Sequence, residues 1–135
     1  MAGERITDYF HLVVGFEFPA QNYTLDAGLV NLYTEATRDS SDIFRSDKLV
    51  PPMAVSAYAM AALSQAIALP IGTIHVSQEL DFLKQVKVGD VITCYSKISR
   101  KIDRAGMRMM NVEITVANQS DETVLTGKVG FILPC

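Results

Sequence analysis

The chain lacks the signals of a nucleic-acid-binding protein. It has no run of Lys or Arg and no cluster that combines basic with aromatic side chains. Affinity for nucleic acids comes largely from Lys and Arg on phosphates. A net charge of −3 and a pI of about 5.3 therefore argue against a nucleic-acid partner.

Cysteine is also scarce. The two cysteines are Cys94, in a predicted strand, and Cys135, the last residue. Neither belongs to a C-x-x-C or another metal-ligand spacing. We interpret Cys94 as a small buried apolar side chain, assign no role to Cys135, and expect neither a metal nor another cofactor.

Targeting and membrane signals are missing as well. The first ten residues, MAGERITDYF, carry charges where a signal peptide would need an apolar core. The longest apolar segment is too short and too interrupted by polar groups to be a good membrane span. We therefore expect a cytoplasmic protein without a membrane partner. Its 135 residues are enough for one domain with a real core, so we predict a single domain over 1–135.

The most distinctive segment that the sequence does contain is PPMAVSAYAMAALSQAIALPIG, residues 51–72. Two prolines open it, and Pro70 with Gly72 closes it. Alanine recurs between them, and residues 53–69 include no Gly, Pro or charged residue. Alanine is the best helix former and proline suits only a helix start, so we predict one helix over 53–69. Its apolar residues occur on every side, which predicts burial on more than one side.

Strand signals surround this helix. Residues 11–18 are rich in β-branched and aromatic residues and predict a first strand, followed by a turn at 19–22. Thr24 as N-cap and apolar residues at helical spacing predict a short amphipathic helix over about 25–37. After the central helix, hairpin spacing predicts an antiparallel meander. Its strands are expected at 73–83, 91–102, 107–118 and 122–134.

The strand predicted at 73–83 alternates between polar and apolar residues. His75 shares the polar face with Ser77 and Glu79. A histidine so placed is either a hydrogen-bonded residue of a sheet face or a replacement base at a subunit interface. The opposite, apolar face is predicted to consist of Ile74, Val76, Leu80 and Phe82.

One long apolar helix beside one antiparallel sheet is an α+β arrangement. A single sheet can cover a helix that is apolar all round only if the sheet curls strongly around it. That geometry is the hot-dog fold, which we predict. A cystatin-like sheet with one helix is the alternative, although such a helix normally keeps an exposed polar face.

Three segments carry a family resemblance: YTLDAGLVNLYTEATRDSSDIF, VPPMAVSAYAMAALSQ and GTIHVSQELDFLKQVKVGDVI. They resemble the MaoC-like hydratase/dehydratase family of hot-dog proteins over about residues 11–134. The most specific part is HVSQELDFLKQVKVGD, residues 75–90. The resemblance implies action on acyl thioesters of coenzyme A or acyl carrier protein. Water would be added to a 2-enoyl double bond or removed from a 3-hydroxyacyl group.

The family's catalytic loop reads approximately Asp-x-Asn-Pro-x-His, in which the Asp and the His divide the proton transfers. Asp39 matches the catalytic Asp, but Phe44 stands where the His is expected and cannot transfer a proton. Active members also have a Gly before the central helix, and its amide polarises the thioester carbonyl. Pro52 stands near that position and has no N–H.

These departures resemble the non-catalytic half of two-part MaoC-like enzymes, or the degenerate N-terminal half of fused fatty-acid-synthase-type dehydratases. We therefore predict a hydratase/dehydratase subunit that acts with a catalytic partner, in a homodimer or a heterodimer. Two other functions stay open: a non-enzymatic acyl-thioester-binding or scaffolding module, and a hot-dog thioesterase. A thioesterase would need a carboxylate or another activating group at the helix start, where the sequence has none.

The resemblance also provides candidate site residues. Asp39 is the candidate acid or base, with the capping of a loop turn as its alternative role. The basic residues that could contact carrier phosphates include Lys84, Lys87, Lys97, Arg100 and Lys101. The candidate substrate-binding residues are Pro52, Met53, Ala54, Tyr58 and His75.

Overall fold

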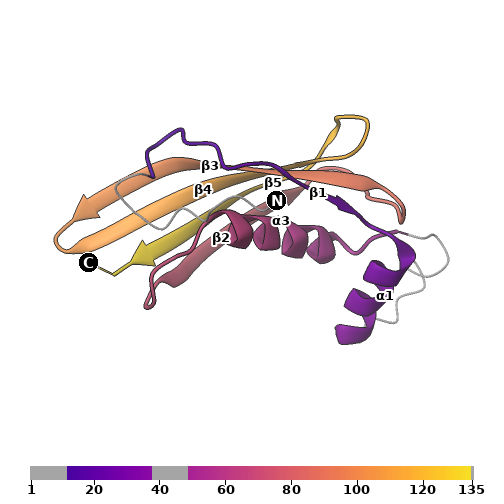
Figure 1. The fold of residues 1–135 in the computed structure, drawn as a ribbon, viewed down its shortest axis with the longest axis horizontal. Helices are drawn as coiled ribbons and strands as arrows, with labels where there is room; N and C mark the ends of the chain where they lie inside the picture. Colours follow the sequence, from indigo (N-terminus) through magenta and orange to yellow (C-terminus); the bar gives the residue numbers. More distant parts are fainter. Residues whose placement is uncertain (1–11, 38–48, 135) are drawn as a thin grey trace.

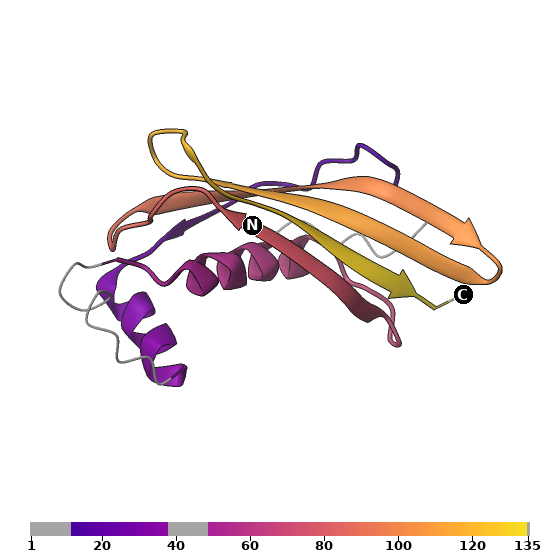
Figure 2. The ribbon, with the colours of Figure 1, turned by 180° about the vertical axis from the view of Figure 1, so that it is seen from behind.

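The computed structural model describes residues 12–37 and 49–134. Five strands form one antiparallel sheet in the order β1-β3-β4-β5-β2. The sheet curves over helix α3, and helix α1 lies at one end, beyond the start of α3 (Figures 1 and 2). This arrangement confirms the predicted α+β, hot-dog fold. The elements are β1 (Gln21–Thr24), α1 (Ala27–Ala36), α3 (Pro52–Ala66), β2 (Ile74–Phe82), β3 (Val91–Arg104), β4 (Met107–Ala117) and β5 (Thr123–Leu133).

Helix α3 begins at Pro52 and ends at Ala66, close to the predicted bounds. Proline suits the first helical position because no N–H is needed there. The helix ends where Ile67 becomes extended, although the Ile67 N–H still donates to the Leu63 carbonyl at 3.0 Å. Small side chains dominate the face that packs on the sheet, so the helix can approach the strands closely. The buried residues of α3 are Ala54, Val55, Ser56, Ala59, Ala62, Leu63 and Ala66.

The prediction that α3 is buried on more than one side is not met within this chain. Met53 is 51% exposed, and Ala57 and Ala61 lie on the same uncovered side. The sheet therefore covers one face of the helix and leaves a second apolar stripe open. The sequence alone indicated the apolar stripe but not what would cover it.

The predicted four-strand meander is only partly correct. Strands β3, β4 and β5 pair in chain order, but β2 pairs with β5 at the sheet edge instead of with β3. The segment between β2 and β3 packs inward instead of forming a tight hairpin turn. Val86 is buried, and its carbonyl accepts a hydrogen bond from the Val50 N–H at 2.7 Å. Sequence spacing between strands carries no information about such tertiary packing.

A bulge in β2 changes which residues share a face. The register shifts between His75 and Ser77, so the strict alternation is broken there. His75 lies opposite Phe131, whose side chain is buried on the helix-facing side, whereas Ser77 and Glu79 lie on the outer side. The predicted grouping of His75 with Ser77 and Glu79 is therefore wrong, because the bulge places an extra residue, Val76, between two paired positions.

The N-terminal part differs most from the prediction. Residues 12–18 run beside β3 but make only one isolated β-bridge, between Glu17 and Lys97. Gly15, at φ +90°, turns the chain there and prevents a continuous ladder. The first described strand is β1, where a turn was predicted. Helix α1 is capped by Asp26 instead of Thr24, because the Asp26 Oδ1 accepts the Leu29 N–H at 2.9 Å.

One hydrophobic core lies between α3 and the sheet, and Cys94 is buried in it as predicted. Within residues 12–37 and 49–134, no helix combines the length and the apolarity needed to cross a bilayer. The sheet residues with the most completely buried side chains are Ile92, Ile98, Met110, Val112, Ile114, Val116, Val124, Leu125 and Val129.

The turn between β3 and β4 offers a stability test. Ala105 has φ +52° and Gly106 has φ +78°, so both residues occupy the left-handed region. We expect Ala105→Gly to raise the free energy of unfolding by about 1 kcal/mol, because glycine adopts this conformation without a Cβ clash. Urea denaturation measures the change. Ala61→Gly, on the exposed side of α3, is the matched control and should lower stability by about 1 kcal/mol. Destabilisation by Ala105→Gly would contradict the strain argument.

Candidate functional site

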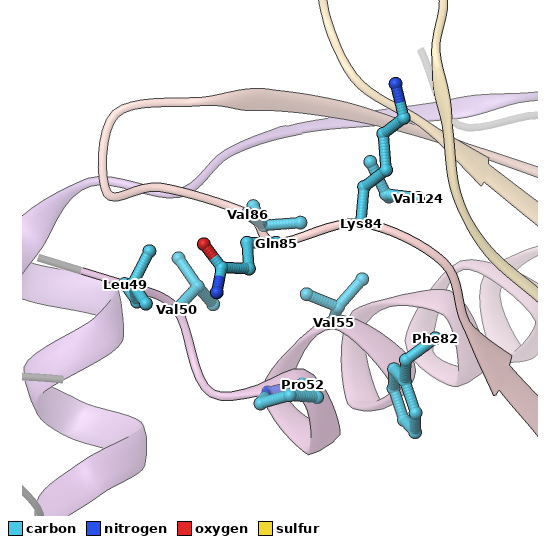
Figure 3. Close-up of a pocket in the computed structure, with 9 residues that line it drawn as sticks. All are labelled: Leu49, Val50, Pro52, Val55, Phe82, Lys84, Gln85, Val86 and Val124. Carbon is cyan, nitrogen blue, oxygen red and sulfur yellow. The ribbon is translucent and has the colours of Figure 1, made fainter. Parts of the chain in front are cut away.

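A pocket of about 230 Å³ opens beside the first turn of α3. It lies between the helix start, the end of β2 and the segment that follows β2 (Figure 3). Its walls are mostly apolar. Figure 3 shows that the Lys84 side chain extends away from the other labelled side chains, so that only its stem borders the pocket. The lining residues are Leu49, Val50, Pro52, Val55, Phe82, Lys84, Gln85, Val86 and Val124.

The backbone at the helix start has few free donors. Pro51 and Pro52 have no N–H, and the Ala54 N–H donates to the Pro51 carbonyl at 2.9 Å. The Met53 N–H has no acceptor among the described residues. It is therefore the one donor of residues 51–54 that could meet a ligand, and it lies at the positive end of the helix dipole.

Tyr58 does not line this pocket. Its ring packs against Tyr23 of β1, with ring centroids 5.1 Å apart. Burial first, and the nearby Asp26 second, raise the pKa of Tyr58. The Tyr23 hydroxyl is buried and finds no hydrogen-bond partner in the described part of the chain. The contact between the two rings packs β1 against α3. Tyr58 is thereby engaged with Tyr23, and the structure gives no support for direct contact between Tyr58 and a ligand in the pocket.

His75 is also distant from the pocket. Its ring lies 5.3 Å from the Phe131 ring, and its Nε2 is 3.0 Å from the Ser77 carbonyl oxygen. His75 precedes Phe82 by seven residues, roughly 23 Å at about 3.3 Å per residue. It lies instead toward a second hollow, of about 340 Å³, at the other end of α3, which Phe131 lines.

The remaining site residues that the sequence predicted lie in different places relative to the pocket. Asp39 and Phe44 lie outside the described residues. Ala54 is buried in the core, whereas Pro52 borders the pocket and Met53 is exposed beside it. Sequence reasoning missed seven residues that line the pocket at the helix start. Three of them fall within HVSQELDFLKQVKVGD, the segment with the most specific resemblance. The missed residues are Leu49, Val50, Val55, Phe82, Gln85, Val86 and Val124.

One lining residue, Lys84, forms an ion pair with Glu122, which does not line the pocket. The Lys84 ammonium contacts a carboxylate oxygen of Glu122, and the second oxygen accepts the Asn118 Nδ2–H at 3.2 Å. These two hydrogen bonds, with Lys84 as the larger cause, lower the pKa of Glu122. Lys84 is the only basic residue that lines this pocket in the part of the chain described. Lys97, in contrast, pairs with Glu113 at 3.7 Å on the outer face of the sheet.

The chain belongs to the family of the FAS1-like dehydratase domain region, whose model matches residues 12–127. Among curated proteins, a UPF0336 protein of Thermobifida fusca (strain YX) is 24% identical in an alignment of length 127 that covers 82% of this chain and 83% of that protein. The family-model match over residues 12–127 spans both the helix start and the segment after β2. The predicted resemblance to MaoC-like hydratases and dehydratases is thereby confirmed.

Two solved structures illustrate the shared fold. The R-hydratase PhaJ1 from Pseudomonas aeruginosa is 20% identical, with a TM-score of 0.78 over 93% of this chain and 84% of that chain. The HadBC complex from Mycobacterium tuberculosis, a 3R-hydroxyacyl-ACP dehydratase, is 17% identical. Its TM-score is 0.71 over 88% of this chain and 96% of that chain. These likenesses establish the hot-dog fold.

The buried thiol next to Tyr23 gives a chemical test of the core. Burial raises the pKa of Cys94 to about 12, so almost no thiolate forms at pH 8. We expect folded Cys135→Ser protein to react with a thiol reagent such as DTNB at least about a hundredfold more slowly than the same protein in urea. Absorbance of the released thiolate follows the reaction. Rapid labelling of the folded variant would show that Cys94 is accessible.

Proposed function

We propose that this chain is a cytoplasmic subunit of a 2-enoyl-acyl thioester hydratase or 3-hydroxyacyl thioester dehydratase. The substrate is carried on coenzyme A or acyl carrier protein, and a partner subunit supplies the catalytic Asp and His. The observation that carries this proposal is Phe44 at the expected histidine position, within a chain of a dehydratase family. The two prolines at the start of α3 support it, because they remove N–H groups from the expected carbonyl site.

In this proposal the chain binds the substrate and the partner transfers the protons. The apolar pocket accepts the acyl chain against Val55, Phe82 and Val124. The Met53 N–H, at the positive end of α3, is placed to polarise the thioester carbonyl. A cavity of about 150 Å³ is enough for benzene, so roughly 230 Å³ suits an acyl chain of about six to nine carbons.

The proposed partner pairs with the exposed edge of the sheet. Ile74 is 58% exposed, Val76 45% and Phe82 44%, all on β2, the edge strand. Such an edge has unpaired backbone groups that another strand can satisfy. The uncovered stripe of α3 would be buried at the same time. The HadBC structure supports the proposal to the extent that it is a complex of hot-dog chains. The dimer can be formed with a second copy or with a catalytic MaoC-like subunit.

The activity test compares the chain alone with the chain plus its partner. We expect no crotonyl-CoA hydration by the purified protein, and hydration after the product of a neighbouring MaoC-like gene is added. Loss of absorbance of the enoyl thioester measures the rate. Robust activity of the chain alone, abolished by Asp39→Asn, would contradict the claim that its own site is incomplete.

The pocket itself can be tested by filling it. We expect Val55→Phe to lower kcat/KM of the partner-supplemented reaction about tenfold or more, because the larger side chain occupies the acyl space. Val14→Phe is the matched control, since Val14 is 59% exposed and does not line the pocket. Equal rates for the two variants, both folded and both able to bind the partner, would exclude this pocket as the acyl site.

The edge-strand dimer makes a separate prediction. A charge on an edge strand opposes pairing with another strand. We therefore expect Val76→Lys to raise the dimer dissociation constant about tenfold or more, whereas Val14→Lys leaves it unchanged. Sedimentation velocity over a concentration series measures both variants. A Val76→Lys protein that dimerises like the parent would place the interface elsewhere.

A non-enzymatic acyl-thioester-binding module is the second candidate. It is favoured by the pocket lining, in which Lys84 is the single ionisable side chain among the residues that the structure describes. This alternative predicts ligand binding without turnover under any partner condition. A thioesterase ranks last, because the described lining includes no carboxylate that could activate water.

A further inference from the structure

A row of apolar side chains crosses the outer face of the sheet. In Figures 1 and 2 the two labelled helices lie on the same side of the sheet, so within the described residues no helix covers the opposite, outer face. Strand pairing places four apolar residues opposite one another on this face, where an antiparallel sheet commonly has polar side chains. All four are at least partly exposed. This apolar row consists of Ile74, Ile132, Met109 and Ile102.

Farther along the strands, the same face carries a row of four charges. The register pairs each charge with one of opposite sign on the next strand. From β2 to β3 the signs are negative, positive, negative and positive. A row in this order is self-complementary, because the reversed row presents the opposite sign at every position. This charged row consists of Glu79, Lys128, Glu113 and Lys97.

We propose that the outer face binds the outer face of a second copy of this chain, about a two-fold axis that runs parallel to the strands between β4 and β5. Such an axis places β3 over β2 and β4 over β5 of the second copy. Lys97 then faces Glu79 of the second copy. Glu113 likewise faces Lys128 of the second copy, so opposite charges meet along the whole row. An axis along the row would instead place each charge against itself.

The same axis suits the rows on either side of the charged row. The apolar row meets its own copy, which removes exposed apolar surface from water on both chains. On the other side, Tyr95 of β3 is 45% exposed and stands in one row with Asp81 of β2. Asp81 and Thr126 line a hollow of about 340 Å³ on this face. The axis brings Tyr95 over that hollow in the second copy, where its hydroxyl can donate to the Asp81 carboxylate.

The curvature of the sheet limits how closely the two faces can approach. The outer face is convex, because the sheet curves over α3 (Figures 1 and 2). Its two middle strands, however, carry the short side chains of Thr115 and Thr126, whereas the longer Tyr95 and Lys97 stand on β3, nearer the side. The edge of β2 and the pocket at the start of α3 stay available, so this association is independent of the proposed reaction.

The area of the face predicts a weak association. Four strands about 4.8 Å apart and four rows about 6.8 Å apart span roughly 500 Å² on each copy. A total of roughly 1,000 Å² is at the low end for a specific interface, so we expect a Kd of about 10 to 100 µM. Where the β2 edges are already paired, this step joins two dimers into a tetramer. Where they are not, it joins two monomers.

A charge swap tests the contact, the axis and the occupant together. We expect Lys97→Glu and Glu79→Lys each to raise the Kd of this step about tenfold or more, because like charges then face each other twice. An equimolar mixture of the two variants should associate like the parent, since each face supplies the charge that the other has lost. Within one chain the two residues are three strand spacings apart, about 14 Å, too far to compensate one another. Sedimentation velocity over a concentration series measures each Kd.

The matched controls are Lys87→Glu and Glu35→Lys, which make the same charge changes outside the strands of the sheet. They should leave this Kd unchanged, alone or mixed. Non-specific attraction cannot explain recovery in the first mixture, because each replacement changes the net charge of −3 by two and both proteins stay negative, at −5 and −1.

Three results would overturn the proposal. The first is a parent protein that shows no such step up to about 1 mM, tenfold above the expected range, which would leave the apolar row to a different partner. The second is a mixture as dissociated as its two components, and the third is control variants that act like the charge-swap variants. Each of these leaves the hydratase proposal intact, since that proposal depends on turnover with a catalytic partner.

Discussion

Close contact between the small-residue face of α3 and the curved sheet is the interaction on which the rest of the structure depends. Ala54, Ala59 and Ala62 let the helix backbone approach the sheet, while Val112 and Ile114 are almost fully buried beneath it. Burial of this continuous apolar area is the main source of stability in such a domain. It also fixes the start of α3 next to the end of β2, which is where the pocket forms.

In the proposed function, the helix start serves binding more than catalysis. Two prolines suit the start of α3, because the first helical position needs no N–H. They also remove N–H donors that a thioester carbonyl could use. The nearby lining is apolar, and its one cation is neutralised by Glu122. In the proposed function this lining holds an acyl group, and among the described residues that line the pocket none is a carboxylate or a histidine that could transfer a proton. For this reason we propose that this chain binds the substrate and that a partner subunit transfers the protons.

Strand β2 connects the pocket to assembly. It ends at the pocket with Phe82, and as the edge strand it exposes Ile74 and Val76. The bulge at Val76 turns His75 toward the helix-facing side, where it packs on Phe131. One extra residue in the strand therefore decides which face His75 occupies, and removes it from the polar group that strict alternation indicated. The same strand can then carry both a wall of the pocket and the edge that a partner would pair with.

The sequence by itself determined the helix over most of 53–69, the four long strands and the family, because these depend on local propensity, periodicity and motif. It could not determine that β2 pairs with β5, that residues 12–18 form no strand, or that Asp26 caps α1. Strand order, bulges and cap choice depend on contacts between residues far apart in the chain. The residues of the candidate site also divide into those that the sequence could predict and those that it could not. Pro52 and Met53 could be identified from the motif, whereas Val55, Phe82 and Val124 met only after folding. Tertiary structure decided the pocket, because its walls come from three segments that the sheet brings to one end of α3.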